Sequence, residues 1–211
     1  MGNKHISELP SLEELKGVLA DEARAIQQIP ITEAYHEAVR CILHHVHQLG
    51  GKVITSGMGK AGQIAGTMAT TFCSTGTPAV FLHPSEAQHG DLGIISPKDL
   101  LIIISNSGKT REILELIELA RKFVPDIPFI CITGNIESEL AQKANITLHT
   151  GGSPEVCPLG LTPTTSTTVM TVMGDLLVIS CMKAIGFTRE EYSKRHHGGY
   201  LGSKSRNGSV E

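Results

Sequence analysis

The chain has 211 residues, which is enough for one large domain or two small ones. Its net charge is −3, and it has no block of Lys and Arg of the kind that nucleic-acid partners require. Hydrophobic residues make up 40% of the chain, enough for a sizeable core, and we expect no membrane contact because no apolar run approaches the roughly 20 residues that span a bilayer.

Two helices are expected first. Ser11 is placed to cap one that extends to about Gln27, and Thr32 to cap another that ends before Gly50 and Gly51. Short apolar runs then alternate with helical patterns. The runs predict strands at 52–55, 79–82, 100–104, 128–132 and 146–149. The patterns predict helices at 60–74, 85–89, 111–123, 138–143 and 166–185, and a short one from 188.

This alternation indicates an α/β fold. Strands that are apolar throughout belong to a parallel sheet covered on both faces. We therefore expect one three-layer α/β/α sandwich with five parallel strands, doubly wound like flavodoxin, over residues 1–202. A polar, disordered tail is expected at 203–211. In such folds ligands bind beyond the carboxyl ends of the strands, where the strand order reverses.

The cysteines and the amino terminus favour a cytoplasmic location. The five cysteines are scattered, odd in number and form no C-x-x-C pair, which is typical of reduced thiols. The first residues lack the apolar core of a signal peptide.

A hydroxyl-rich turn follows the third predicted strand, with Ser105, Ser107 and Thr110 just before a helix. Free N–H groups at a helix amino terminus attract anions, and a glycine lets the backbone come close. The pattern indicates a phosphate cradle, although an ordinary turn capped by Ser107 also fits. A nucleotide P-loop does not fit, because that motif needs a glycine where Ile103 stands.

A second loop follows the first predicted strand and contains Gly57, Gly59 and Lys60. It matches G-x-G-x-x-G, but a dinucleotide site also needs an acidic residue at the end of the next strand, and that strand ends in Leu82-His83-Pro84. Lys60 suits a sugar phosphate or a developing negative charge better, unless it is a solvated loop lysine. We also assign substrate contacts to Ser56, Gly57 and Gly59.

Titratable side chains supply the remaining candidates. His83 and His89 lie in one short polar segment, but their spacing is not a strong zinc signature, so substrate contact or a structural role fits better. Glu112 begins a helix, where a carboxylate also stabilises the helix dipole. Glu155 lies in a loop rich in Pro and Gly and suits proton transfer. His196 offers an imidazole, which can donate or accept a proton.

Together these motifs resemble one subfamily, the sugar isomerase (SIS) domain of D-arabinose 5-phosphate isomerases. The resemblance covers about residues 10–202. It rests on Gly57-Met58-Gly59-Lys60-Ala61-Gly62, Ser74-Thr75-Gly76-Thr77-Pro78, His83-Pro84-Ser85-Glu86-Ala87, His89-Gly90-Asp91-Leu92-Gly93, Ser105-x-Ser107-Gly108, Cys157-Pro158-Leu159-x-Leu161-x-Pro163-Thr164 and His196-x-x-Gly199-x-Leu201-Gly202.

The resemblance implies interconversion of D-ribulose 5-phosphate and D-arabinose 5-phosphate through a cis-enediol. This is the first step toward Kdo, a sugar of lipopolysaccharide and some capsules. It also implies a cytoplasmic homotetramer that needs no metal or organic cofactor. Residues at matching catalytic positions are Lys60, Glu112, Glu155 and His196. Residues at matching substrate positions are Gly76, Thr77, His83 and His89, and His83 also matches a position of inhibitory zinc.

We expect these residues to divide the chemistry among them. Ser105, Ser107 and Thr110 would hold the 5-phosphate, and Lys60 would stabilise the enediolate. Glu155 is the favoured carbon base, while Glu112 orients the substrate or shares the proton transfer. His196 would move protons between oxygens, in its own subunit or a neighbouring one.

Two departures from the family bear on regulation and on the last loop. Many relatives carry a pair of CBS modules after this domain, and the chain stops before that point. Feedback by CMP-Kdo at the sugar site is therefore our hypothesis. The histidine motif reads His-His-Gly-Gly where many relatives have His-Pro-x-Gly.

Two alternatives to the arabinose 5-phosphate isomerase remain. One is an isomerase of hexulose or sedoheptulose phosphates, and the other is a non-catalytic sugar-phosphate sensor.

Overall fold

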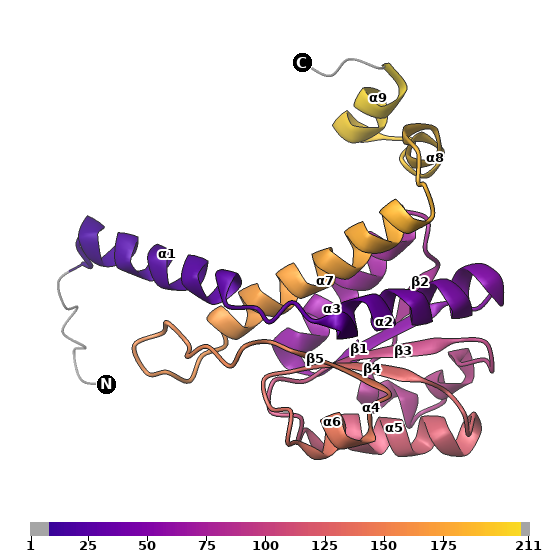
Figure 1. Ribbon diagram of the computed structural model, residues 1–211, viewed down its shortest axis with the longest axis horizontal. Helices are drawn as coiled ribbons and strands as arrows, with labels where there is room; N and C mark the ends of the chain where they lie inside the picture. Colours follow the sequence, from indigo (N-terminus) through magenta and orange to yellow (C-terminus); the bar gives the residue numbers. More distant parts are fainter. Residues whose placement is uncertain (1–8, 208–211) are drawn as a thin grey trace, which may run out of the picture.

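Five parallel strands form one sheet in the computed structural model, which describes residues 9–207 (Figure 1). Their order, β2-β1-β3-β4-β5, reverses between β1 and β3 and confirms the expected doubly wound fold. In register, Val53 of β1 lies beside Leu100 of β3, and Leu101 lies beside Phe129 of β4. The strands are β1 (Val53–Gly57), β2 (Ala79–Phe81), β3 (Leu100–Ile104), β4 (Phe129–Thr133) and β5 (Ile146–His149).

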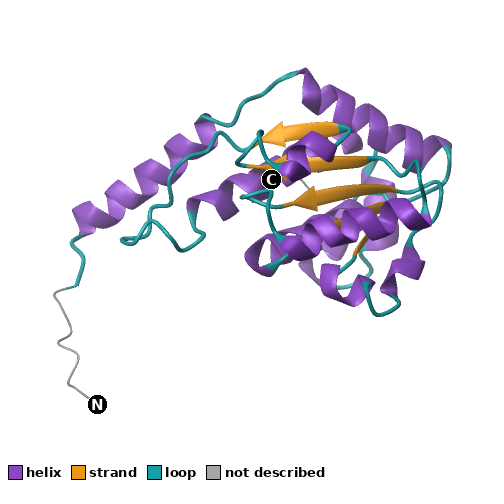
Figure 2. Cartoon of the chain, turned by 90° about the horizontal axis from the view of Figure 1, so that it is seen from below, coloured by secondary structure: helices purple, strands orange, loops and turns teal. Residues whose placement is uncertain are grey.

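Helices cover both faces of the sheet (Figure 2). Because side chains alternate along a strand, Ile102 packs under one helical layer and Ile103 under the other. The first layer is α2 (Glu33–Ile42), α3 (Gly59–Ser74) and α7 (Thr165–Ala184). The second layer is α4 (Pro84–Ala87), α5 (Arg111–Phe123) and α6 (Glu139–Lys143). A 3₁₀ turn at Asp91–Ile94 follows α4.

The helices at the start of the chain match the expectation in part. Ser11 caps α1 (Leu12–Gln27) with a full capping box. Thr32 makes no side-chain cap bond to α2, so the expected cap is wrong there. The second helix does extend nearly as far as expected, because α2 continues as a π-helix over Leu43–Gln48.

The helix α7 corrects the expectation about apolar length. It has 20 residues and contains an 18-residue window with a mean hydropathy of 1.4, so by length and composition it could cross a membrane. However, the core helix of a globular domain passes the same test, and half of this window is buried. Met173 and Leu177 lie in the core, and α7 packs along α3. We therefore assign α7 to the core.

Both ends of the described chain extend away from the sheet (Figure 1). The helix α1 exposes Leu12, Leu15 and Leu19 on its surface. At the other end lie α8 (Arg189–Arg195) and α9 (Gly199–Asn207). The expected disordered tail from Ser203 is wrong as far as Asn207, because α9 packs on α8 and the Arg206 guanidinium donates to the His196 and His197 carbonyls. Residues 208–211 lie outside the described chain.

Candidate functional site

A cavity of about 300 Å³ lies at the carboxyl ends of β1 and β3, where the strand order reverses. We call it the switch-point cavity. This is the position at which doubly wound sheets bind ligands. Its walls come from the loop after β1, the turn after β3 and the first turns of α7. The lining residues are Met58, Lys60, Ala61, Ile104, Ser105, Asn106, Ser107, Thr110, Pro163, Ser166, Thr167 and Met170.

Three helices begin at this cavity, namely α3, α5 and α7. The residues at the N-cap positions of α3 and α5 are Met58 and Thr110, and neither makes a side-chain cap bond. The first N–H groups of both helices are therefore free of a capping side chain. Helix amino termini also carry partial positive charge, so together they favour an anion such as a phosphate.

The turn after β3 is closely packed around one glycine. The Ser105 and Thr110 hydroxyls lie 3.1 Å apart, and Ser105 is buried. Gly108 has φ +62°, and a Cβ there would overlap Ser138 Oγ, so only glycine fits. Ser107 Oγ accepts from the Lys109 N–H and does not cap α5. The alternative of a turn capped by Ser107 is therefore wrong.

The loop after β1 brings Lys60 to the cavity. Gly57 lets the start of α3 approach, because a Cβ there would lie 2.8 Å from the Ala61 backbone, and Gly59 has φ +56°. Lys60 is exposed and makes no ion pair with any residue in 9–207. Its ammonium group is therefore available to an anionic ligand. Ser56, by contrast, is fully buried and donates to the Leu82 carbonyl at 2.6 Å, so the expected substrate contact by its hydroxyl is wrong.

Glu155 lies behind the cavity wall and holds the amino end of α7. Its Oε2 accepts from the Thr164 N–H at 2.8 Å, the Thr164 hydroxyl at 3.1 Å and the Ser166 N–H at 3.2 Å. Its Oε1 accepts from the Ser166 hydroxyl at 2.5 Å. Partial burial opposes ionisation, but these donors outweigh it and lower the pKa of Glu155 below its usual value. A carboxylate held in this way is a weak base.

The two histidines after β2 lie outside the cavity lining. His83 Nδ1 accepts from the Ser85 N–H and caps α4, while His89 is exposed beyond that helix. Among residues 9–207 there is no group of three or more His, Cys, Asp or Glu placed to hold a metal ion. Glu112 stands on the first turn of α5, two residues after Thr110 and outside the cavity lining, and its side chain has no hydrogen-bond partner in the described chain.

Three predicted site residues lie at the opposite end of the sheet. Gly76 and Thr77 precede β2, at the amino ends of the strands, and a Cβ on Gly76 would lie 2.8 Å from the Phe187 ring. His196 follows α8, and its ring stacks on Tyr192 with the centroids 3.7 Å apart. Since the 20 residues of α7, a length of about 30 Å, separate the cavity from Phe187, one copy of the chain does not bring these residues to Lys60.

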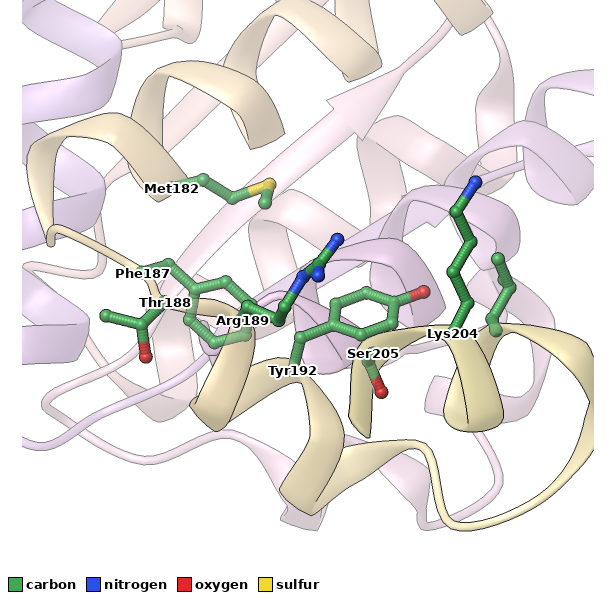
Figure 3. Close-up of a pocket in the computed structure, with 8 residues that line it drawn as sticks. Met182, Phe187, Thr188, Arg189, Tyr192, Lys204 and Ser205 are labelled. Atoms are coloured by element: carbon green, nitrogen blue, oxygen red, sulfur yellow. The ribbon is translucent and has the colours of Figure 1, made fainter. Parts of the chain in front are cut away.

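A second cavity of about 270 Å³ accompanies these distant residues (Figure 3). It lies between the end of α7 and the last two helices, with Phe187 and Tyr192 on its wall and Arg189 and Lys204 beside them. It shares no lining residue with the switch-point cavity. The sequence analysis did not anticipate it, because its residues come together only when α8 and α9 pack.

Sequence reasoning also missed several residues of the switch-point cavity. Asn106 lies inside the recognised turn, but an amide carries no specific signal. Ser166 and Thr167 belong to a hydroxyl cluster that capping of α7 alone could explain. Met58, Pro163 and Met170 are ordinary apolar residues until the fold places them on the wall.

Comparison with known proteins fits this geometry. The SIS domain model matches residues 50–180, which is more than half of the chain. The chain belongs to the SIS domain family. Its match spans the loop of Lys60, the turn of Ser105 to Thr110 and most of α7.

Named relatives of this SIS domain are phosphosugar isomerases. Arabinose 5-phosphate isomerase KdsD of Shigella flexneri is 52% identical over 154 residues, which are 73% of this chain and 46% of that protein. The structure of a "putative phosphosugar isomerase involved in capsule formation" from Bacteroides fragilis NCTC 9343 is 61% identical, with a TM-score of 0.88, over 90% of this chain and 98% of that one. An Escherichia coli CFT073 protein in complex with arabinose 5-phosphate is 34% identical, with a TM-score of 0.81, over 88% and 96%. The chain spans about half the length of the curated relatives it matches.

The loop before α7 also holds the thiol of Cys157, which accepts two backbone hydrogen bonds. The N–H groups of Leu161 and Thr162 donate to Cys157 Sγ at 3.2 and 3.1 Å. Desolvation opposes ionisation, but these backbone donors outweigh it and lower the pKa of Cys157 to about 7. Because the thiolate is the nucleophile, alkylation by iodoacetamide should rise with pH and reach half its maximal rate near pH 7. Peptide mass spectrometry of the native protein measures this rate.

Cys41 is the internal control, because burial raises the pKa of its thiol and it should react only at higher pH. A midpoint for Cys157 close to the ordinary thiol value of about 8.5 would contradict the assigned hydrogen bonds.

Proposed function

We propose that this SIS domain interconverts D-ribulose 5-phosphate and D-arabinose 5-phosphate, as the first step of Kdo formation for lipopolysaccharide or capsule. The observation that carries the proposal is the switch-point cavity, where two uncapped helix amino termini, a hydroxyl-rich turn and Lys60 face one space. The names of the relatives support the pentose phosphate as substrate.

The cavity has an anion-binding side and a lysine. The 5-phosphate binds the turn, where Ser105, Ser107 and Thr110 offer hydroxyls beside the free N–H groups of α5. A base removes the proton from C2 of the aldose or C1 of the ketose. The electron pair forms the cis-enediolate, whose oxygen Lys60 stabilises, and a proton returns to the other carbon.

Of the two candidate carboxylates, the one that accepts no hydrogen bonds within the chain is the better candidate for the base. Glu155 is engaged by its four donors, whereas Glu112 is not. We assign the carbon base to Glu112, and the oxygen-to-oxygen proton transfer to the partner subunit's His196. Gly76 and Thr77 contribute only through a second copy, and His83 and His89 border the substrate. No metal or organic cofactor is needed for this chemistry, and His83 remains the proposed position of inhibitory zinc.

We also propose that the chain forms a cytoplasmic homotetramer. The exposed leucines of α1 form an apolar surface that a further copy can cover. The length of α7 between Lys60 and the last helices supports a site completed by a second copy, if His196 takes part in it. All five cysteines are free thiols, which fits a reducing compartment.

The first prediction of this proposal concerns turnover. With D-ribulose 5-phosphate in deuterated water, the protein should form D-arabinose 5-phosphate and place deuterium at C2 of the aldose or C1 of the ketose. Lys60→Ala should lower kcat about 10²–10³-fold, because the oxyanion loses a charged partner. Lys98→Ala is the control, since Lys98 is exposed before β3, away from the cavity. Product identification by mass spectrometry and NMR measures both.

The same assay separates the alternatives. Faster turnover of a six- or seven-carbon ketose phosphate would identify that sugar phosphate, and not the pentose phosphate, as the substrate. Binding of sugar phosphates without label or product would identify a sensor.

The second prediction concerns sharing of the site between subunits. Lys60→Ala and His196→Ala should each be nearly inactive alone. Co-expressed at equal levels, they should recover about a quarter of wild-type activity, because random pairing leaves that fraction of sites with both groups intact. Specific activity of the purified mixed oligomer measures this, and recovery no greater than the sum of the two variants would show that His196 does not act in the site of a neighbouring subunit.

The third prediction concerns feedback. If CMP-Kdo binds at the sugar site, it should raise the unfolding temperature and compete with D-arabinose 5-phosphate. A ligand at 100 times its Kd stabilises the native state by about 2.7 kcal/mol. Thermal-shift titration against CMP alone tests the idea, and an unchanged Tm would exclude this form of regulation.

A further inference from the structure

We infer that Glu155 is a positioning residue that acts through Ser166: it holds the Ser166 hydroxyl proton and leaves the oxygen to accept a hydrogen bond from a sugar hydroxyl. The inference rests on the proposed function, because it names a contact within the same cavity. It changes the role expected of Glu155 from carbon base to the group that sets the hydrogen-bonding direction of a neighbour.

The contacts fix this direction. A serine hydroxyl has one proton and two lone pairs. Ser166 Oγ lies 2.5 Å from Glu155 Oε1, and an ionised carboxylate can only accept. The hydroxyl proton therefore points at Glu155. The Ser166 N–H also donates to Glu155 Oε2, so one carboxylate binds both the backbone and the side chain of Ser166.

Ser166 is then an acceptor on the wall of the switch-point cavity. Ser166 is only 8% exposed. The hydrogen bond to Glu155 sets the direction in which its hydroxyl group can interact with a ligand. A phosphate oxygen needs a donor and gains nothing from such a hydroxyl. A sugar hydroxyl has a proton to give and matches it. The pair thus recognises the polyol part of the substrate, while the turn of Ser105 to Thr110 recognises the phosphate.

The amino end of α7 keeps Glu155 ionised. Two backbone N–H groups and the Thr164 hydroxyl bind the same carboxylate, and the lowered pKa reflects those donors. The next residue, Thr165, has a separate partner, since its hydroxyl donates to Glu22 at 3.1 Å. Glu22 therefore supports the same helix turn without touching Ser166, and it supplies a matched control.

The test is a double-mutant cycle on Glu155→Gln and Ser166→Ala. Glutamine has the size of glutamate, and its carbonyl oxygen can still accept from the backbone N–H groups. Its NH₂ group donates to Ser166, so the hydroxyl proton turns toward the cavity. We expect each single variant to lower kcat/KM for D-ribulose 5-phosphate about 10- to 100-fold, mainly through KM. The double variant should be no worse than Ser166→Ala.

Binding provides a readout that loosening of α7 would not reproduce. Both variants should weaken calorimetric binding of D-arabinose 5-phosphate and leave binding of inorganic phosphate unchanged. Glu22→Gln should change neither, although it replaces a carboxylate of α1 that binds Thr165 in the same turn of α7. These measurements need no turnover, so they test the inference even if the wild type fails as an isomerase, which would overturn the proposed function alone.

Two results would overturn the inference. One is a further loss of about 10²–10⁴ in kcat when Glu155→Gln is added to Ser166→Ala, with loss of the acid limb of the pH profile, because that is the signature of a base. The other is unchanged sugar-phosphate binding in Ser166→Ala. This variant removes one oxygen atom, so its result decides the matter even if Glu155→Gln fails to fold.

Discussion

The site depends on the meeting of three helix amino termini at one edge of the sheet. In a parallel sheet every strand ends at the same edge, so α3 and α5 begin there as a consequence of topology. Topology alone does not place the start of α7 at this edge, because a loop over residues 150–164 separates α7 from β5. Glu155 anchors this loop to the start of α7, and in doing so brings a third helix to the cavity.

This anchoring has an electrostatic cost that the helix offsets. A carboxylate beside a cavity for an anion would repel the ligand. The negative charge of Glu155 is instead offset by four hydrogen-bond donors at a helix end that has partial positive charge. Lys60, which lines the cavity, makes no ion pair within the described chain. The amino ends of α3 and α5 lack side-chain caps and are therefore available to the proposed phosphate. The three helix ends thus have different tasks.

Sequence reasoning succeeded where a local pattern determines the structure. Apolar runs located all five strands, and the turn at Ser105 and the loop at Lys60 follow directly from strand ends. It failed for Ser56, whose burial depends on a hydrogen bond to the next strand. It failed for the tail as well, because the packing of α9 on α8 and the hydrogen bond from Arg206 to the His196 carbonyl leave no mark in the local sequence pattern. The partners of Glu155 are nine and eleven residues away, and no spacing rule anticipates that a glutamate so far upstream will cap a helix.

The separation of His196 from Lys60 is the most informative disagreement between sequence and structure. The resemblance to the family implies that His196 and Lys60 belong to one site. Within one chain, however, the 20 residues of α7 separate them. Both statements hold if the symmetry of an oligomer brings the far end of one α7 to the near end of another. A two-fold axis perpendicular to α7 reverses the direction of this helix. Two copies packed side by side about such an axis would place carboxyl end beside amino end in both copies at once. The projecting helices α1, α8 and α9 lie at these two ends, where such a pairing would cover them (Figure 1). In the proposed oligomer the exposed leucines of α1 and the distance to His196 would have one cause, namely that each active site is built from at least two chains.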